Sequence, residues 1–216
     1  MALLTPTPPH AVSTAFSSGL PAFLSGGPAG TVVSEKYVGK APPIPSLVDV
    51  STPGGITNVT SALEAFVLTL QDAANNTGVI SPAATGWIFF AGDANNKTVL
   101  GRMIQRRHAW KLVAVHYGPV IWETMNVSVN LAKTQPAVLP AGNYDLRLLA
   151  VPGLNLEVFW LAAQTPGSSD WIIPTPTDPS VPSPPLAPTP QPMQTFLAQI
   201  GPQAVSALSM ASGYGA

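Results

Sequence analysis

The sequence predicts a mainly-β protein: a β-sandwich or barrel-like antiparallel sheet, one N-terminal core helix and extended proline-rich arms. Between positions 57 and 173, short runs of strand-type residues alternate apolar with polar side chains and are separated by glycine or proline turns. The chain also holds 25 prolines, which remove backbone donors and oppose long helices and central strands. Only 9% of its residues are charged, against roughly 25% in an ordinary soluble domain.

Residues 1–56 are rich in proline, glycine, serine and threonine, and we interpret them as an N-terminal arm. Residues 6–30 show no sustained helical or strand period, whereas residues 31–38 are compatible with a short strand. The prolines of segment 42–45 predict extended, polyproline-like chain. An arm of this composition is either disordered or ordered by lying on another surface.

The globular core is expected over residues 57–173, and it should begin with a helix that ends near Asn75. Ser61 and Glu64 have the spacing of a capping box, in which a hydroxyl and a carboxylate satisfy two free backbone amides. The apolar residues then follow at helical spacing, and they are Leu63, Phe66, Val67 and Leu70. Residues 66–70 alone are also compatible with a strand.

Strands are expected in the rest of the core, because β-branched and aromatic residues gather in short runs there. The expected strands are residues 87–90, 99–104, 110–117, 120–131, 144–148, 154–160 and 170–173. Pro152 and Gly153 should form a turn between two of these strands.

Two segments follow the core. Prolines recur every few residues from 174 to 192, which predicts a semi-rigid linker. Residues 193–216 carry no charged side chain and predict a short apolar helix with a stripe formed by Met193, Phe196, Leu197 and Ile200. A short helix cannot bury such a stripe alone, so it folds back, associates or stays unfolded; we predict that these four residues bind a partner.

The positive charge of the chain is concentrated between Lys97 and Lys111, with no acidic residue between Asp93 and Glu123. This pattern indicates a site for an anion or a glycan, and the candidate residues are Arg102, Arg106, Arg107, His108 and Lys111. Trp110, His116 and Tyr117 interleave with them. The alternative interpretation is a solvated turn between two strands. Nucleic acid is not expected, because no recognised binding signature accompanies the charges.

Several kinds of chemistry lack a signal in this sequence. Without cysteine there are no disulfides and no thiolate sites. His108 and His116 have no nearby cluster of carboxylates, so neither a metal nor another cofactor is expected. There is no nucleophile elbow and no phosphate-binding loop. No run is long enough to span a membrane, and no signal peptide is recognised, which favours the cytoplasm or an assembled particle.

Three functions remain for this chain. A structural or interaction protein, a self-associating subunit of a larger protein assembly, ranks first because the surface is nearly uncharged and the arms are long. A β-sandwich that binds an anion or glycan through residues 97–117 is the alternative. An enzyme whose site comes from residues distant in sequence ranks third, since no local constellation of catalytic groups is visible.

Overall fold

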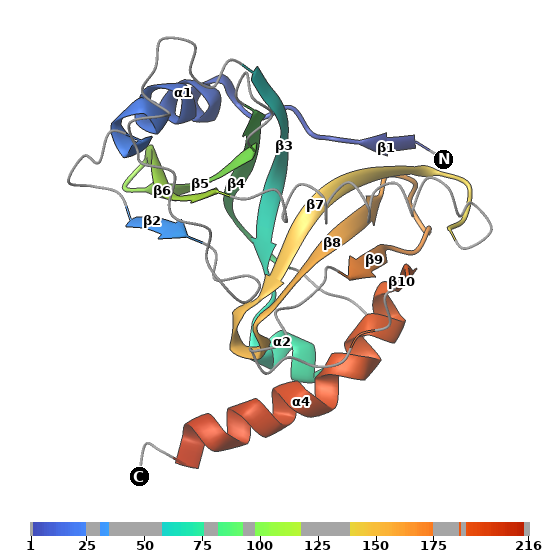
Figure 1. The fold of residues 1–216 in the computed structure, drawn as a ribbon. Helices are drawn as coiled ribbons and strands as arrows, with labels where there is room; N and C mark the ends of the chain where they lie inside the picture. The colour runs from blue at the N-terminus through green and yellow to red at the C-terminus, as the bar shows by residue number, and fades with distance from the viewer. Residues whose placement is uncertain are drawn as a thin grey trace. The chain divides into compact units, whose positions relative to one another are not determined.

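The computed structural model describes residues 2–24, 31–34, 58–75, 82–92, 98–117, 139–174, 186 and 189–213 (Figure 1). Its contacts divide the chain into two compact units. Unit 1 comprises Met1–Leu4, Ala65–Ala84 and Met125–Ala216, and unit 2 comprises Thr5–Glu64 and Thr85–Thr124. Most of the regular structure is β-strand, so the predicted mainly-β class is confirmed.

In unit 1 the strands lie in the order β10-β9-β8-β7-β3. They are β10 (Gln191–Pro192), β9 (Trp171–Pro174), β8 (Leu156–Ala163), β7 (Asn143–Val151) and the last residues of β3 (Asn58–Val67). The short helix η2 (Pro152–Leu154) joins β7 to β8, where the sequence predicts a turn. Strand β1 (Ala2–Leu4) pairs in parallel with the start of β7.

One face of this sheet is covered by helix α4 (Met193–Gly213) together with the short helix α2 (Leu70–Asn75). Leu149 on β7, Val158 on β8 and Ile172 on β9 pack with the first half of α4, and all three side chains are fully buried. A Cβ on Gly201 would lie 3.4 Å from the carbonyl oxygen of Ala73, which is an ordinary van der Waals distance, so α4 and the α2 backbone lie close together at this point.

In unit 2 the strands lie in the order β3-β4-β5-β6-β2. They include β4 (Ala83–Gly92), β5 (Thr98–Arg106), β6 (Ala109–Tyr117) and β2 (Thr31–Ser34). Helix α1 (His10–Leu24) packs on this sheet through Val12, Phe16 and Leu20, which recur every four residues on one helix face. The rings of Phe16 and Phe89 stack with their centroids 4.5 Å apart.

The helix expected from Ser61 is wrong, because residues 58–67 form strand β3. Ala62, Leu63 and Ala65 are all buried, so this strand is covered on both faces and lacks the alternation that would have revealed it. The helix that does form begins at Leu70. Its N-terminus is capped by Thr69, whose Oγ1 accepts a 3.1 Å hydrogen bond from the Asp72 backbone N–H.

Helix α1 lies within residues 1–56, where the sequence analysis expects an arm without a regular period. Its apolar stripe consists of only three large residues at four-residue spacing, separated by serine, alanine and other small residues, which gives a weak helical period in the sequence. The other expected strands are confirmed where the structure describes them, whereas segments 42–45 and 120–131 and most of the linker lie outside the described residues. The division into an arm, a core and a linker stays a prediction.

The sheet pairing is mixed, whereas the sequence predicts an antiparallel sheet. Strands β1 and β3 both pair in parallel with β7, and β2 pairs in parallel with β6. Each parallel pair joins strands that are far apart in the chain, and local hairpin patterns carry no information about such pairs. Among the described residues, none of the helices has the length and hydropathy that crossing a bilayer requires.

Candidate functional site

The basic stretch forms the β5–β6 hairpin of unit 2. The two strands pair without interruption from Val99 opposite Tyr117 to Arg106 opposite Ala109, apart from a bulge after Arg102. Arg107 and His108 are left as a two-residue turn, and their φ angles are 49° and 67°. Positive φ at both central residues is the backbone of a type I′ turn, which favours asparagine followed by glycine.

Replacing the two turn residues by the preferred pair, Arg107→Asn with His108→Gly, should stabilise the hairpin by about 1 kcal/mol. Both side chains are exposed and form no hydrogen bond with the described residues, so the exchange removes backbone strain without removing a contact. The urea midpoint of unfolding and the hydrogen exchange of β5 and β6 amides measure the effect. A lower midpoint would mean that the native side chains stabilise the turn.

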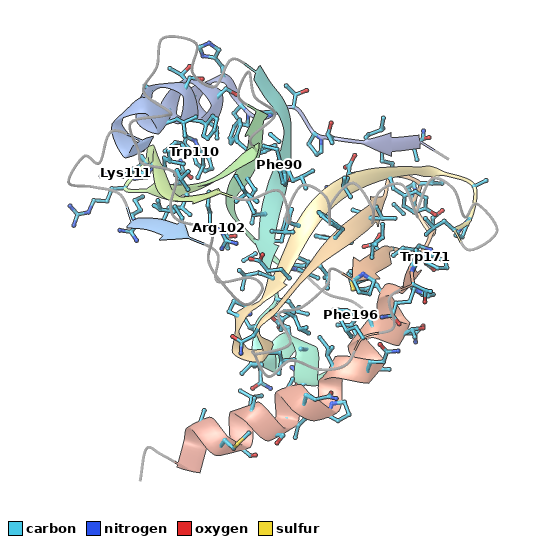
Figure 2. All side chains as sticks on the ribbon, viewed as in Figure 1. Phe90, Arg102, Trp110, Lys111, Trp171 and Phe196 are labelled. Atoms are coloured by element: carbon cyan, nitrogen blue, oxygen red, sulfur yellow. The ribbon has the colours of Figure 1, made fainter. Side chains whose placement is uncertain are left out.

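The two faces of the hairpin differ in chemistry. Met103, Trp110 and Leu112 belong to or pack against the buried cluster that contains Phe16 of α1. Trp110 is labelled in Figure 2. A Cβ on Gly101 would lie 2.4 Å from the Phe16 ring, which shows that this face of β5 is turned toward α1. Because side chains alternate along a strand, Arg102, Ile104 and Arg106 lie on the other face. Lys111 pairs with Ile104 and therefore lies on that face as well.

Three positive charges of the hairpin have no partner among the described residues. Arg106, Arg107 and Lys111 are exposed, and they form no ion pair or hydrogen bond with the described residues. The described residues of unit 2 include one acidic side chain, Glu64 on β3. We name Arg102, Arg106, Arg107, His108 and Lys111 together the basic hairpin site; Arg102 is half-buried and His108 is exposed.

The structure therefore brings all five predicted anion-binding residues onto one hairpin. The position of Arg107 and His108 in the turn also agrees with the alternative interpretation of a solvated turn. Lys97 and the side chains of His116 and Tyr117 lie outside the described residues. In the part of the chain that the structure describes, no three histidine, aspartate or glutamate side chains converge as a metal site requires.

The four residues predicted to bind a partner on α4 are buried in unit 1 instead. Met193 is 5% exposed, and the others are not exposed at all. Of the three outcomes for this stripe, the helix has folded back on its own sheet, because Phe196, Leu197 and Ile200 complete the core there. These side chains are consequently not available at the surface. The exposed large apolar residues of α4 are Val205 and Met210, with 54% and 60% exposure.

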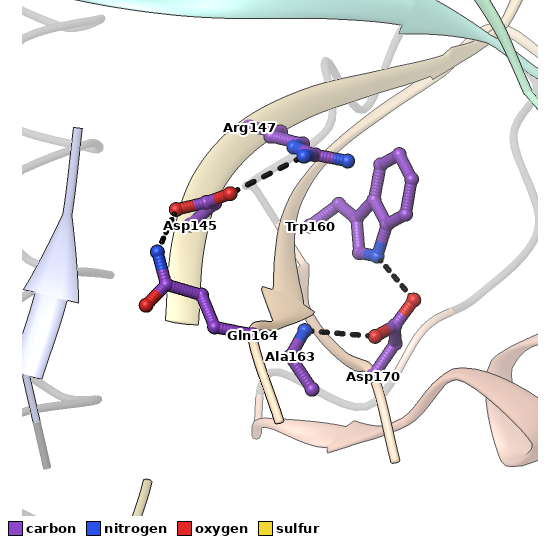
Figure 3. A network of polar contacts seen from close by, with 6 residues as sticks. All are labelled: Asp145, Arg147, Trp160, Ala163, Gln164 and Asp170. Carbon is purple, nitrogen blue, oxygen red and sulfur yellow. Dashed lines mark hydrogen bonds and ion pairs between the residues drawn. The ribbon is translucent and has the colours of Figure 1, made fainter. Parts of the chain in front are cut away.

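A polar network in unit 1 was missed by the sequence analysis (Figure 3). The carboxylate of Asp170 accepts hydrogen bonds from Trp160 Nε1 and from the Ala163 backbone N–H, both at 2.9 Å. Its backbone carbonyl accepts a third from the N–H of Met193, the first residue of α4. In the sequence Asp170 has no distinguishing feature, since its partners come from a neighbouring strand and a distant helix.

The rest of the network surrounds Arg147. Its guanidinium lies over the ring of Trp160 at 4.9 Å and over that of Phe66 at 5.1 Å, which is within the range of cation–π attraction. An Arg147 Nη donates a 3.3 Å hydrogen bond to Asp145, whose other oxygen accepts one from Gln164. The charge of Arg147 is thus balanced within unit 1, in contrast to the exposed cations of the hairpin. We interpret this network as a structural clamp.

Burial raises the pKa of the Tyr144 phenol, and the negative charge of Asp170 raises this pKa further. The phenol donates a long hydrogen bond of 3.5 Å to the carbonyl of Pro140, four residues earlier. A tyrosine at the start of a strand that bonds back to the preceding turn is the corner found in many β-sandwich domains. This contact links Tyr144 to the turn that precedes β7, and we interpret it as structural.

Comparison with known proteins identifies no relative of this chain. No protein-family model matches it, and neither a curated protein nor a solved structure does. The function is therefore inferred from the residues of the chain itself.

Proposed function

We propose that this chain is a non-enzymatic interaction protein that binds an anionic partner through the basic hairpin site. The observation that carries the proposal is the exposure of Arg106, Arg107 and Lys111 at one hairpin end, with no ion pair to the described residues. Arginine presents a planar fork of donors that matches carboxylate and phosphate groups. A partner of opposite charge would relieve the mutual repulsion of these cations, which water and salt otherwise only screen.

The sequence context favours binding over a merely solvated turn. Four of the nine lysines and arginines of the chain fall within residues 102–111, and no acidic residue lies between positions 98 and 117. A solvated face normally intersperses charges of both signs. In a chain with only 9% charged residues, such a local excess of one sign is a specific feature of this hairpin.

The triple variant Arg106→Gln, Arg107→Gln and Lys111→Gln tests the proposal. Each exposed ion pair contributes roughly 0.2–1 kcal/mol, so losing three should weaken binding of poly-L-glutamate by about tenfold at low ionic strength. Isothermal titration calorimetry at two salt concentrations measures the affinity. The matched control is Lys36→Gln, Lys40→Gln and Lys133→Gln, which removes the same charge from outside the hairpin. Equal losses in both variants would refute the hairpin as the site.

A second candidate function is that of a subunit in a protein assembly. The second half of α4 favours it, because Val205 and Met210 are exposed on a helix that carries no charged residue. Burying them against another chain would remove apolar surface from water without separating any charge from its solvent. Light scattering should then detect an oligomer of the unchanged chain. The double variant Val205→Gln with Met210→Gln should be a monomer. A monomer at every concentration would exclude this function for the helix.

A further inference from the structure

We infer that the partner of the basic hairpin site is an extended acidic polypeptide segment that lies along the charged face of the hairpin, an inference that rests on the proposed function. Three cations lie on this face, and we name Arg102, Lys111 and Arg106 together the row. Lys111 pairs directly with Ile104, which stands between Arg102 and Arg106 on β5. Lys111 is therefore the diagonal neighbour of Arg106, at about 7–8 Å between the positions, and it lies on the same face as Arg102 with the bulge between them.

This spacing matches the repeat of an extended chain. In a β-strand, side chains on one face recur every second residue, at about 6.8 Å. Acidic residues at alternate positions of an extended segment would thus meet Arg106, Lys111 and Arg102 in succession. Each contact joins a carboxylate to a lysine or arginine, and the arginine contacts can be bidentate. Acidic residues at consecutive positions would place at least one carboxylate on the far side of the segment.

The apolar side chains of the same face suit a peptide rather than a bare ion. Ile104 and Ala114 are half-buried and Ala109 is exposed, and they lie on the same face of the strands as the cations. These three side chains form an uncharged surface that the backbone and short side chains of an extended segment can contact. A small inorganic anion would use one or two cations and would leave this surface uncovered.

Single-stranded nucleic acid fits this face less well. Proteins that bind it usually stack its bases on exposed aromatic rings. Trp110 lies on the opposite face, where it packs against the cluster beneath α1 (Figure 2). Phe90 on β4 is 2% exposed and offers no ring surface. Among the described side chains of the hairpin, the charged face therefore presents cations and aliphatic groups without a stacking platform.

Three probes of equal charge distinguish these partners by NMR titration of the full chain. The first is the peptide Glu-Thr-Glu-Thr-Glu with blocked ends, the second is its isomer Thr-Glu-Glu-Glu-Thr, and the third is a thymidine tetranucleotide with three phosphates. We expect the alternating peptide to bind about threefold more tightly than its isomer, which corresponds to one additional exposed ion pair. The tetranucleotide should bind no more tightly than the isomer.

Single variants test whether the residues of the row bind the peptide. Arg106→Gln and Lys111→Gln should each weaken the alternating peptide by about threefold, since each removes one ion pair. The variant Arg107→Asn with His108→Gly removes one charge of the basic hairpin site and should weaken both peptides alike. It should retain the preference for the alternating peptide, because both residues belong to the turn and not to the row. It serves as the matched control for charge removed from the same hairpin.

Each outcome has a separate meaning. Equal affinity for the two peptides would contradict the claim that the row binds alternate acidic residues. If the triple glutamine variant weakened both peptides, the proposed function would still be supported. Tighter binding of the tetranucleotide would contradict an acidic peptide as the partner and would indicate nucleic acid instead. Binding of all three probes that is insensitive to the triple variant would refute the proposed function itself.

Discussion

Replacing Phe196 with alanine should lower the free energy of unfolding of unit 1 by about 4 kcal/mol. Phe196 is not exposed at all, and its ring belongs to the cluster between the sheet face and α4. Truncation removes the transfer energy of the ring and leaves a cavity that the surrounding strands can fill only in part. Urea unfolding followed by circular dichroism measures the loss. Since an average domain is stable by only about 5–15 kcal/mol, such a change is large.

Met210→Ala is the matched control on the same helix, because Met210 is 60% exposed. Its effect should stay within about 0.5 kcal/mol, as for most surface substitutions. If both variants behaved alike, α4 would not be seated on the sheet through Phe196. Deleting residues 193–216 should likewise destabilise unit 1, because it removes the same packing of α4 on the sheet.

The variant Asp170→Ala should destabilise unit 1 by about 3 kcal/mol. The carboxylate accepts hydrogen bonds from Trp160 Nε1 and from the Ala163 backbone, and Trp160 is only 6% exposed. Alanine leaves the indole donor without an acceptor in a place that water reaches poorly, and hydrogen bonds to a charged group are among the stronger ones. Thermal or urea unfolding measures the loss.

Two further variants separate the hydrogen bonds from the packing at Asp170. Asp170→Asn keeps one acceptor oxygen and should lose about half as much stability. Adding Trp160→Phe to Asp170→Ala should cost less than the sum of the two single changes, because both remove the same hydrogen bond. Strict additivity, or a loss below 1 kcal/mol for Asp170→Ala, would contradict the clamp.

Most strands were predictable because their signal is local. The run 87–90 and the alternation in 144–148 each indicated a strand that the structure contains. The start of the core was not predictable in this way, since Leu63 and Phe66 fit a helical period and also fit a strand covered on both faces. Burial on the second face is set by distant parts of the chain. The capping box at Ser61 starts no helix, and the helix that forms is capped by Thr69 instead.

The candidate site was predictable in its composition and not in its geometry. The concentration of cations from Arg102 to Lys111 is visible in the sequence, and it identifies the hairpin. Which face each cation occupies depends on the pairing register and on the bulge after Arg102, which no local pattern encodes. For α4 the helical period of the apolar stripe was clear from the sequence. The surface that buries the stripe could not be predicted, because it is a sheet formed by residues remote in sequence.

The most direct measurement is an amide NMR titration of the full chain with poly-L-glutamate at low ionic strength. Binding through the hairpin predicts shifts concentrated on the amides of residues 102–112, which fade as salt is raised. Shifts spread evenly over the assigned amides, or concentrated near Lys36, Lys40 and Lys133, would show that the basic hairpin site is only a solvated turn.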